Sequence, residues 1–268
     1  MALYDRIAGL PVRIEGYELE MPSLELAPEF VRATTVIHLH GSGEEGVGED
    51  VTYTPEDHER QIEAGPVLPL EGGWSIDQLS RHLDGVDLWY GAEPSMEQFR
   101  DYRRWAFESA ALDLALRQAG ASLADVLDLP LAPVTFVVST RLDGPEGAAR
   151  VVQMLGREPS LRFKVDPTDE WPEELITQLA ALGAVDVVDM KGQYGDDIPF
   201  GYASSPDTYR RVIAAFPQAY IEDPRLTPEL RETLRGHEDR VTWDAPIHSV
   251  EDILAREWAP RTVNMKPS

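Results

Sequence analysis

Lysine is rare in this chain, and it stands where it could do chemistry. The 268 residues include 24 Lys and Arg, but the only lysines are Lys164, Lys191 and Lys266. Each of them follows a short apolar run that is typical of a buried strand. Arginine keeps its proton in proteins, whereas a desolvated lysine can act as a general base. The pattern therefore indicates lysines that titrate at the ends of strands.

Carboxylates end the strands that lie between two of these lysines. Asp189, Glu222 and Asp244 follow three successive apolar runs, and Lys164 and Lys266 follow the runs before and after them. Successive members of this series are 22 to 33 residues apart, about one strand and one helix. Three carboxylates at one place repel one another, so they require lysine counter-charges or a metal. Oxygen ligands of this kind suit Mg²⁺.

The elements that must position these residues lie in residues 131–268. Six short strands are expected, at 134–140, 161–166, 185–191, 218–224, 240–246 and 262–266, with amphipathic helices at 148–155, 172–182, 206–216, 228–234 and 250–258. Apolar strands separated by helices form a parallel sheet. An open sheet would keep the outer strand ends far apart, whereas a (β/α) TIM-type barrel brings all of them to one mouth. The series of charged strand ends therefore favours the barrel.

A closed barrel needs eight strands, and only six of the eight fit in this chain. An open remnant would expose two sheet edges, which promotes aggregation. We therefore expect the sequence to be a truncated or partly recorded form of a longer protein.

Residues 1–130 have a different pattern and are predicted to form an α+β domain with connecting helices. Antiparallel strands are expected at 11–20 and 30–41 with a loop between them, a third strand at 46–53, and helices at 75–85 and 96–120. His38 and His40 share a strand face. We interpret them as a structural or exposed pair rather than a metal pair, because no third ligand is evident nearby.

Composition narrows the classes of partner. The formal charge of −24 and the sequence pI near 4.5 oppose binding to nucleic acid and to anionic membranes. The absence of cysteine excludes disulfides and thiolate chemistry, and no apolar run is long enough to span a membrane. We therefore expect a cytoplasmic protein that acts on a small molecule, and a homo-oligomer is left open.

The charged strand ends and their flanking motifs resemble the enolase superfamily, and within it the muconate-lactonizing subgroup. The resemblance covers essentially the whole chain and rests on "RFK", "VDMK", "IEDP", "WDAP" and "NMKPS" in order. It implies an α+β capping domain before the barrel. It also implies that Lys164 and Lys266 are opposing acid/base groups and that Mg²⁺ binds to the three carboxylates, Asp189, Glu222 and Asp244. The lysine after the sixth strand argues against the mandelate-racemase subgroup, which uses a histidine base.

Three residues depart from the pattern of that subgroup. Arg162 stands where the first lysine of a pair is usual, and it would keep the charge next to Lys164 without acting as a base. In a rival register Lys164 pairs with Asp166 instead, which leaves the base on the second strand open. Lys191 stands where asparagine is usual, and Ala245 where glutamate is common. Lys191 would either bind a second substrate anion or pair with a nearby acid, Glu222 or Asp223, and the structural pairing is favoured.

The resemblance implies an isomerase or lyase that depends on Mg²⁺. Such an enzyme would remove the α-proton of a carboxylate substrate to form an enolate, leading to racemisation or epimerisation, syn-dehydration or cycloisomerisation. The alternative is a non-catalytic or inactive enolase-like fragment that acts in binding or assembly, which the three departures favour. A nucleotide-binding open sheet has little support, because no glycine-rich phosphate loop follows the first strand of residues 131–268.

Overall fold

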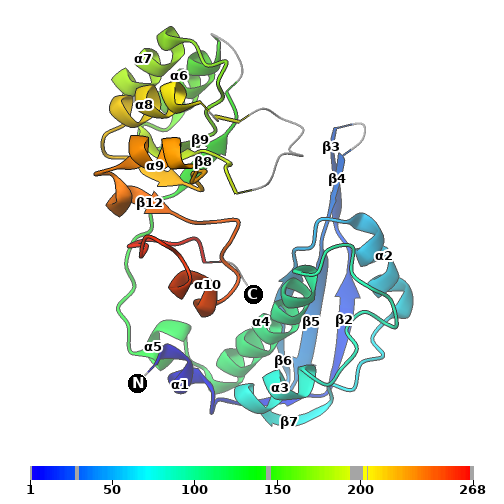
Figure 1. Cartoon of the computed structure of the whole chain (residues 1–268). Helices are drawn as coiled ribbons and strands as arrows, with labels where there is room; N and C mark the ends of the chain where they lie inside the picture. The colour runs from blue at the N-terminus through cyan, green and yellow to red at the C-terminus, as the bar shows by residue number, and fades with distance from the viewer. Residues whose placement is uncertain (1, 28–29, 143–145, 194–201, 204, 266–268) are drawn as a thin grey trace. The chain divides into compact units, whose positions relative to one another are not determined.

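The structure is a computed structural model that describes residues 2–27, 30–142, 146–193, 202–203 and 205–265. The chain divides into two compact units, which we call unit 1, residues 1–132, and unit 2, residues 133–266 (Figure 1). Each unit has its own cluster of buried apolar side chains. No described helix is both long enough and apolar enough to cross a membrane.

Unit 1 is an α+β unit built on a three-stranded antiparallel sheet in the order β2-β5-β6. Two further strand pairs, β1-β7 and β3-β4, are also antiparallel. The strands are β1 (Pro11–Ile14), β2 (Gly16–Glu20), β3 (Ser23–Ala27), β4 (Phe30–Ala33), β5 (Thr35–Gly41), β6 (Glu44–Asp50) and β7 (Gly72–Ser75). The helices are α1 (Leu3–Ile7), α2 (Pro55–Ala64), α3 (Ile76–Leu83), α4 (Phe99–Ala119) and α5 (Leu123–Leu127).

Helix α4 packs directly on strand β6 because that strand carries alternate glycines. Gly46 and Gly48 face the helix, and a Cβ built on Gly48 would lie only 2.0 Å from the carbonyl oxygen of Ala106. The small side chains of Ala106 and Ala110 on the helix are fully buried at this contact. The strand has no Cβ at these positions and the helix has only methyl side chains, so the two backbones can approach closely.

Most expected elements of unit 1 are present, and two regions differ. The predicted strands at 11–20 and 30–41 contain β2 and β5, which pair antiparallel, and the predicted helix at 96–120 is α4. The expected loop between those strands instead includes β3, which forms a hairpin with β4. Helix α2 was not predicted, because the side chains that it buries are the polar Asp57, His58 and Gln61.

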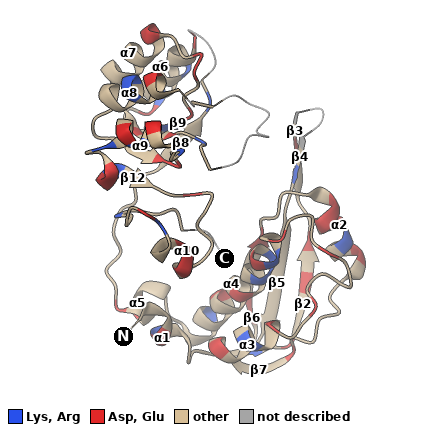
Figure 2. Cartoon of the chain, viewed as in Figure 1, with Lys and Arg blue, Asp and Glu red and all other residues tan. Residues whose placement is uncertain are grey.

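Unit 2 alternates strands and helices, as the sequence predicts (Figure 1). Its strands are β8 (Val137–Thr140), β9 (Arg162–Val165), β10 (Val185–Asp189), β11 (Tyr220–Glu222) and β12 (Val241–Thr242). Its helices are α6 (Gly147–Arg157), α7 (Glu173–Leu182), α8 (Pro206–Ala215), α9 (Pro228–Leu234), the 3₁₀ turn η1 (Glu238–Arg240) and α10 (Val250–Leu254). Figure 2 shows acidic residues distributed over the elements of both units.

The strands of unit 2 form one parallel sheet in the order β12-β11-β10-β9-β8. The sixth expected strand is represented by a parallel bridge between Trp243 and Val263. On β9, Phe163 and Val165 are fully buried in the apolar core, whereas Arg162 and Lys164 occupy the opposite face of the strand. The predicted α/β class, with an α+β region followed by a TIM-type parallel sheet, is therefore confirmed.

Candidate active site

Strands β9, β10 and β11 bring one lysine and two carboxylates together at their C-terminal ends. Lys164 is next to last in β9, and Asp189 and Glu222 are the last residues of β10 and β11. Asp189 and Glu222 are direct partners in the parallel register. Lys164 and Asp189 are 25 residues apart in the sequence, and Asp189 and Glu222 are 33 apart. They share one site because neighbouring parallel strands end at the same edge of a sheet.

The Lys164 ammonium bridges the two carboxylates. Its Nζ lies 3.0 Å from Asp189 Oδ2 and also donates a hydrogen bond to Glu222 Oε1. The side chain of Asp189 is fully buried, and only 18% of the Lys164 side chain is exposed. This arrangement holds a proton-carrying nitrogen directly beside a buried acidic group.

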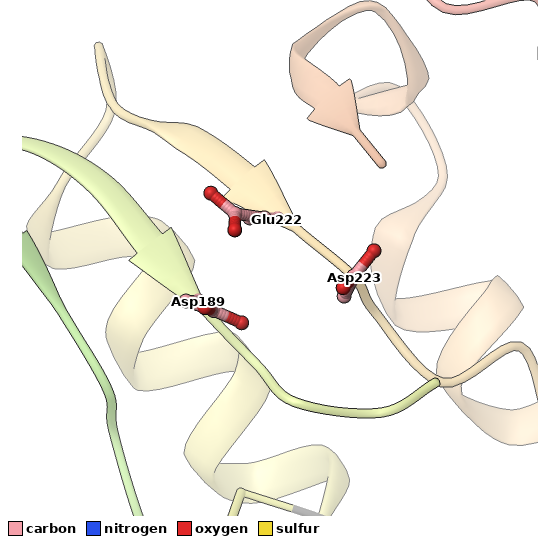
Figure 3. Close-up of side chains that lie close together, drawn as sticks. All are labelled: Asp189, Glu222 and Asp223. Carbon is pink, nitrogen blue, oxygen red and sulfur yellow. The ribbon is translucent and has the colours of Figure 1, made fainter. Parts of the chain in front are cut away.

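Asp223 joins this group, although the strand-end pattern in the sequence does not place it in the site. One carboxylate oxygen each from Asp189, Glu222 and Asp223 lies within 4.8 Å of the others (Figure 3). We call these three residues the carboxylate cluster. In a regular strand Asp223 would point away from Glu222, but its φ of 46° is in the left-handed region and interrupts the alternation of the strand.

Backbone hydrogen bonds fix the position of Asp223. Its two carboxylate oxygens accept the N–H groups of Asp244, at 2.8 Å, and Ala245, at 2.9 Å. Its carbonyl oxygen accepts the N–H of Gly192, at 2.7 Å, which joins the ends of β10 and β11. Asp244 therefore lies next to the carboxylate cluster, but its own carboxylate is not one of the three that converge.

Burial shifts the ionisation of the cluster. Burial and the charge of Asp189 raise the pKa of Glu222 to about 7, although Lys164 opposes the change. Burial also raises the pKa of Asp223 to about 6, against the two backbone N–H groups that it accepts. For Lys164, burial disfavours the charged form, but the attraction of Asp189 and Glu222 is larger and the net effect raises its pKa. Burial therefore favours the protonated forms of Glu222 and Asp223, whereas the carboxylates keep Lys164 in its ammonium form.

Lys191 contacts the cluster from the residue that follows β10 by two positions. Its ammonium donates to Asp189 Oδ2, and its backbone N–H donates to Asp189 Oδ1 at 3.1 Å. The same ammonium lies 3.9 Å from Asp166 Oδ1. The expected pairing of Lys191 with an acid is therefore seen, but its ion-pair partners are Asp189 and Asp166 rather than Glu222 or Asp223.

The two other predicted site residues lie apart from the cluster or outside the described residues. Arg162 makes two hydrogen bonds to Asp186, at 2.9 and 2.5 Å, and within the described part of the chain it contacts none of the three clustered carboxylates. Its predicted role as charge support at the site stays a prediction. Lys266, the expected second acid/base group, lies outside the described residues.

The donor set fits a hard divalent cation. All three members of the cluster are carboxylates, they are at most 6% exposed, and their oxygens converge. Burial raises the pKa of Glu222 and of Asp223, and a bound cation would stabilise the charged forms of both groups. Asp189, Glu222 and Asp223 would hold such an ion, with Asp244 close by.

Several solved structures share this fold. An L-Ala-D/L-Glu epimerase is 16% identical with a TM-score of 0.62, and the match covers 97% of this chain and 77% of that one. A mandelate racemase/muconate lactonizing enzyme-like protein from Rubrobacter xylanophilus is 19% identical, with a TM-score of 0.59 and coverage of 90% and 70%. An enolase from Bradyrhizobium, complexed with magnesium and mandelic acid, is 14% identical, with a TM-score of 0.55 and coverage of 87% and 68%. The enolase-superfamily fold that the motifs indicate is thus confirmed.

Family models match the sequence almost from end to end. The model described as "Domain of unknown function (DUF8230) N-terminal domain" matches residues 5–126, and the corresponding C-terminal domain model matches residues 130–268. No curated protein gives a significant match. The C-terminal match alone covers more than half of the chain, which therefore belongs to the DUF8230 family and has the fold of the enolase superfamily.

Proposed function

We propose that this protein is an Mg²⁺-dependent enzyme that removes the α-proton of a carboxylate substrate. The observation that carries the proposal is the buried carboxylate cluster with the Lys164 ammonium bridging Asp189 and Glu222. A proton carrier beside a cation-binding acidic group is the minimum needed for this chemistry. The magnesium complex of the Bradyrhizobium enolase supports the choice of metal.

In the proposed reaction, the chain's own residues bind the ion and move the proton. Asp189, Glu222 and Asp223 hold the cation, and Asp244 adds negative charge next to them. When bound, Mg²⁺ would supply positive charge that stabilises the negative charge developing on the substrate carboxylate. A cation on Asp189 and Glu222 would weaken their hold on the Lys164 ammonium and so lower the pKa of Lys164. Once neutral, Lys164 takes the α-proton on Nζ, and the C–H electron pair stays on the substrate as the enolate.

The product depends on how the proton returns. The proposed opposing group is Lys266, and proton return from the opposite face of the enolate would invert the α-carbon. Return from Lys164 would instead restore the original configuration. Racemisation or epimerisation, syn-dehydration and cycloisomerisation all begin from this enolate, and the likeness to an L-Ala-D/L-Glu epimerase is the reason to test epimerisation first.

Hydrogen exchange at the substrate tests the proposal. A panel of dipeptides, N-acyl amino acids and 2-hydroxy acids is incubated with the protein in D₂O with Mg²⁺, and loss of the α-proton is followed by NMR. We expect exchange with at least one class. Lys164→Ala should slow it by about 10²- to 10⁴-fold, the usual contribution of a general base. Arg157→Ala, on the exposed end of α6, should exchange at the wild-type rate.

An absence of exchange across the panel, with Mg²⁺ demonstrably bound, would contradict the catalytic proposal. It would favour the second candidate, a non-catalytic protein that uses the fold for binding or assembly. One observation supports that candidate: Asp189 and Asp223 already accept hydrogen bonds on both carboxylate oxygens from groups of the chain itself. Calorimetric titration with Mg²⁺ adds a second test, because failure to bind the ion would also favour this candidate.

Partners and location complete the proposal. The partner is a small-molecule carboxylate rather than nucleic acid or a membrane, and the protein acts in the cytoplasm. The formal charge of −24 supports this choice, because it opposes binding to polyanions. Light scattering would determine whether the protein forms the homo-oligomer that the sequence analysis leaves open.

A further inference from the structure

Lys191 donates hydrogen bonds to Asp189, one of the three carboxylates that would hold the cation. Its ammonium is bonded to Asp189 Oδ2, the same oxygen that lies 3.0 Å from Lys164 Nζ. Its backbone N–H takes the other oxygen of Asp189. A divalent ion therefore meets an Asp189 whose two oxygens are both engaged by the same residue. For the ion to gain Asp189 as a full ligand, at least the ammonium has to leave.

A second position for that ammonium lies close by. Asp166, one residue beyond β9, has a buried Oδ1 that accepts no hydrogen bond from any described residue. This oxygen lies 3.9 Å from Lys191 Nζ, an ion-pair distance that is too long for a hydrogen bond. A buried carboxylate oxygen without a donor is unfavourable, and a shift of the ammonium by about one ångström would satisfy it.

We propose that Lys191 is a tethered cation that shifts from Asp189 to Asp166 when a divalent ion binds to the carboxylate cluster. The inference rests on the proposed function for the presence of that ion. In the ion-free site the ammonium neutralises part of the cluster, and in the loaded site it satisfies Asp166. The lysine thus competes with the ion for Asp189. Asp166 reduces the loss of Mg²⁺ affinity from this competition, because it offers the displaced ammonium a second partner.

Mutations at both ends of the shift give opposite effects on Mg²⁺ affinity, measured by calorimetric titration. Lys191→Met keeps the length of the side chain and removes its charge, so we expect Mg²⁺ to bind about tenfold more tightly. Asp166→Asn removes the second position, so Lys191 stays on Asp189 and Mg²⁺ should bind several-fold more weakly. In the Lys191→Met background, Asp166→Asn should have a much smaller effect, because no ammonium remains to be moved.

A matched control separates competition from a general change in charge. Arg211→Met on α8 also removes one positive charge from unit 2, and the side chains of Arg211 and Lys191 are equally exposed, at 27%. Arg211 pairs with Glu173 and Asp207 rather than with the cluster. We expect its Mg²⁺ affinity to change by less than about twofold.

The wild-type protein offers a direct view of the shift, because the chain has only three lysines. Labelling lysine with ¹³C at Cε gives at most three signals, and Lys191→Met identifies the one from Lys191. Addition of Mg²⁺ should move that signal as the ammonium changes partner. In Asp166→Asn the displacement should differ, because the second partner has lost its charge.

The outcomes distinguish failure of this inference from failure of the proposed function. If wild type binds Mg²⁺ and Lys191→Met binds it equally well, the competition is refuted. If Asp166→Asn weakens binding equally with and without Lys191, Asp166 acts through its charge alone and the shift is refuted. If only Lys191→Met binds Mg²⁺, the competition is supported in its strongest form. If neither protein binds the ion, the proposed Mg²⁺-dependent function itself fails.

Discussion

Both units bury charged side chains, but they balance these charges differently. In unit 1, Arg103 and Asp50 are fully buried and form an ion pair at 2.7 Å. The guanidinium also donates to two backbone carbonyls, those of Leu88 and Asp57, and its centre lies 3.8 Å from the centroid of the Trp89 ring. One cation thus pairs with one anion, and each guanidinium nitrogen of Arg103 donates one hydrogen bond.

The buried charges of unit 2 do not balance in this way. The carboxylate cluster brings three acids together, and Asp166 and Asp244 lie near it. Burial raises the pKa of both Glu222 and Asp223. A balanced buried pair stabilises a fold or is neutral to it, whereas an unbalanced buried cluster persists only if something selects for it. This difference supports a structural role for the network of unit 1 and the proposed functional role for the carboxylate cluster of unit 2.

The largest expected effect comes from breaking the balanced pair. Arg103→Met leaves Asp50 buried without its cation and should lower the free energy of unfolding of unit 1 by about 3–5 kcal/mol. Asp189→Asn removes one charge from the overloaded cluster, and without metal it should change the stability of unit 2 by less than about 1 kcal/mol. Urea unfolding followed by circular dichroism measures both. Equal costs would mean that the cluster is a structural ion-pair network as well.

A smaller effect is expected from adding one methyl group to a tightly packed glycine in each unit. Gly48→Ala places a Cβ 2.0 Å from the carbonyl of Ala106, so α4 must move and stability should fall by about 1–3 kcal/mol. Gly192→Ala places a Cβ 2.2 Å from the backbone nitrogen of Arg225, just beyond Asp223. That change should weaken Mg²⁺ binding several-fold, whereas Gly48→Ala should not.

Gly16→Ala is the control for this pair, because no neighbouring atom lies within 4 Å of its added Cβ. Its unfolding midpoint and Mg²⁺ affinity should match those of the wild type. Weaker Mg²⁺ binding by Gly48→Ala would contradict the inference that the Gly48 contact has only a structural role in unit 1.

Sequence patterns predicted most of unit 2 because its strands and helices bury apolar side chains with clear periods. Phe163, Val188 and Ile221 are all fully buried. The residue that follows each of them on its strand belongs to the site. Helix α2 in unit 1 could not be found in this way. It buries Asp57, His58 and Gln61, so it lacks the apolar periodicity from which a helix is recognised.

The site was predicted in part for a related reason. Strand alternation correctly indicates that Asp189 and Glu222 share a face, and Lys164 joins them across the register. The same rule places Asp223 on the opposite face. It reaches the cluster only because its backbone is left-handed. Aspartate tolerates this conformation better than most residues, but no sequence pattern predicts it here. Lys191 is itself left-handed, with φ of 53°, and its contacts with Asp189 and Asp166 likewise depend on this conformation.

The smallest expected effect is a response to pH that has opposite signs in the two units. Burial lowers the pKa of His58 in unit 1, so the folded state resists protonation and unit 1 should lose stability as pH falls below about 6.5. Glu222 in unit 2 has a raised pKa, so its contribution is fully present below about pH 4.5 and is lost as pH rises through about 7.

Between pH 7.5 and 5.5 in metal-free buffer, we therefore expect unit 1 to lose and unit 2 to gain on the order of 1 kcal/mol. Hydrogen exchange of amides in α4 and β11, corrected for the intrinsic effect of pH, measures each unit separately. His58→Gln should abolish the dependence in α4 alone. Glu222→Gln should reduce the dependence in β11 alone, and the remainder should come from Asp223, whose pKa is raised to about 6. If the stability of both units changes in the same direction with pH, the inferred difference in charge balance between the two networks is contradicted.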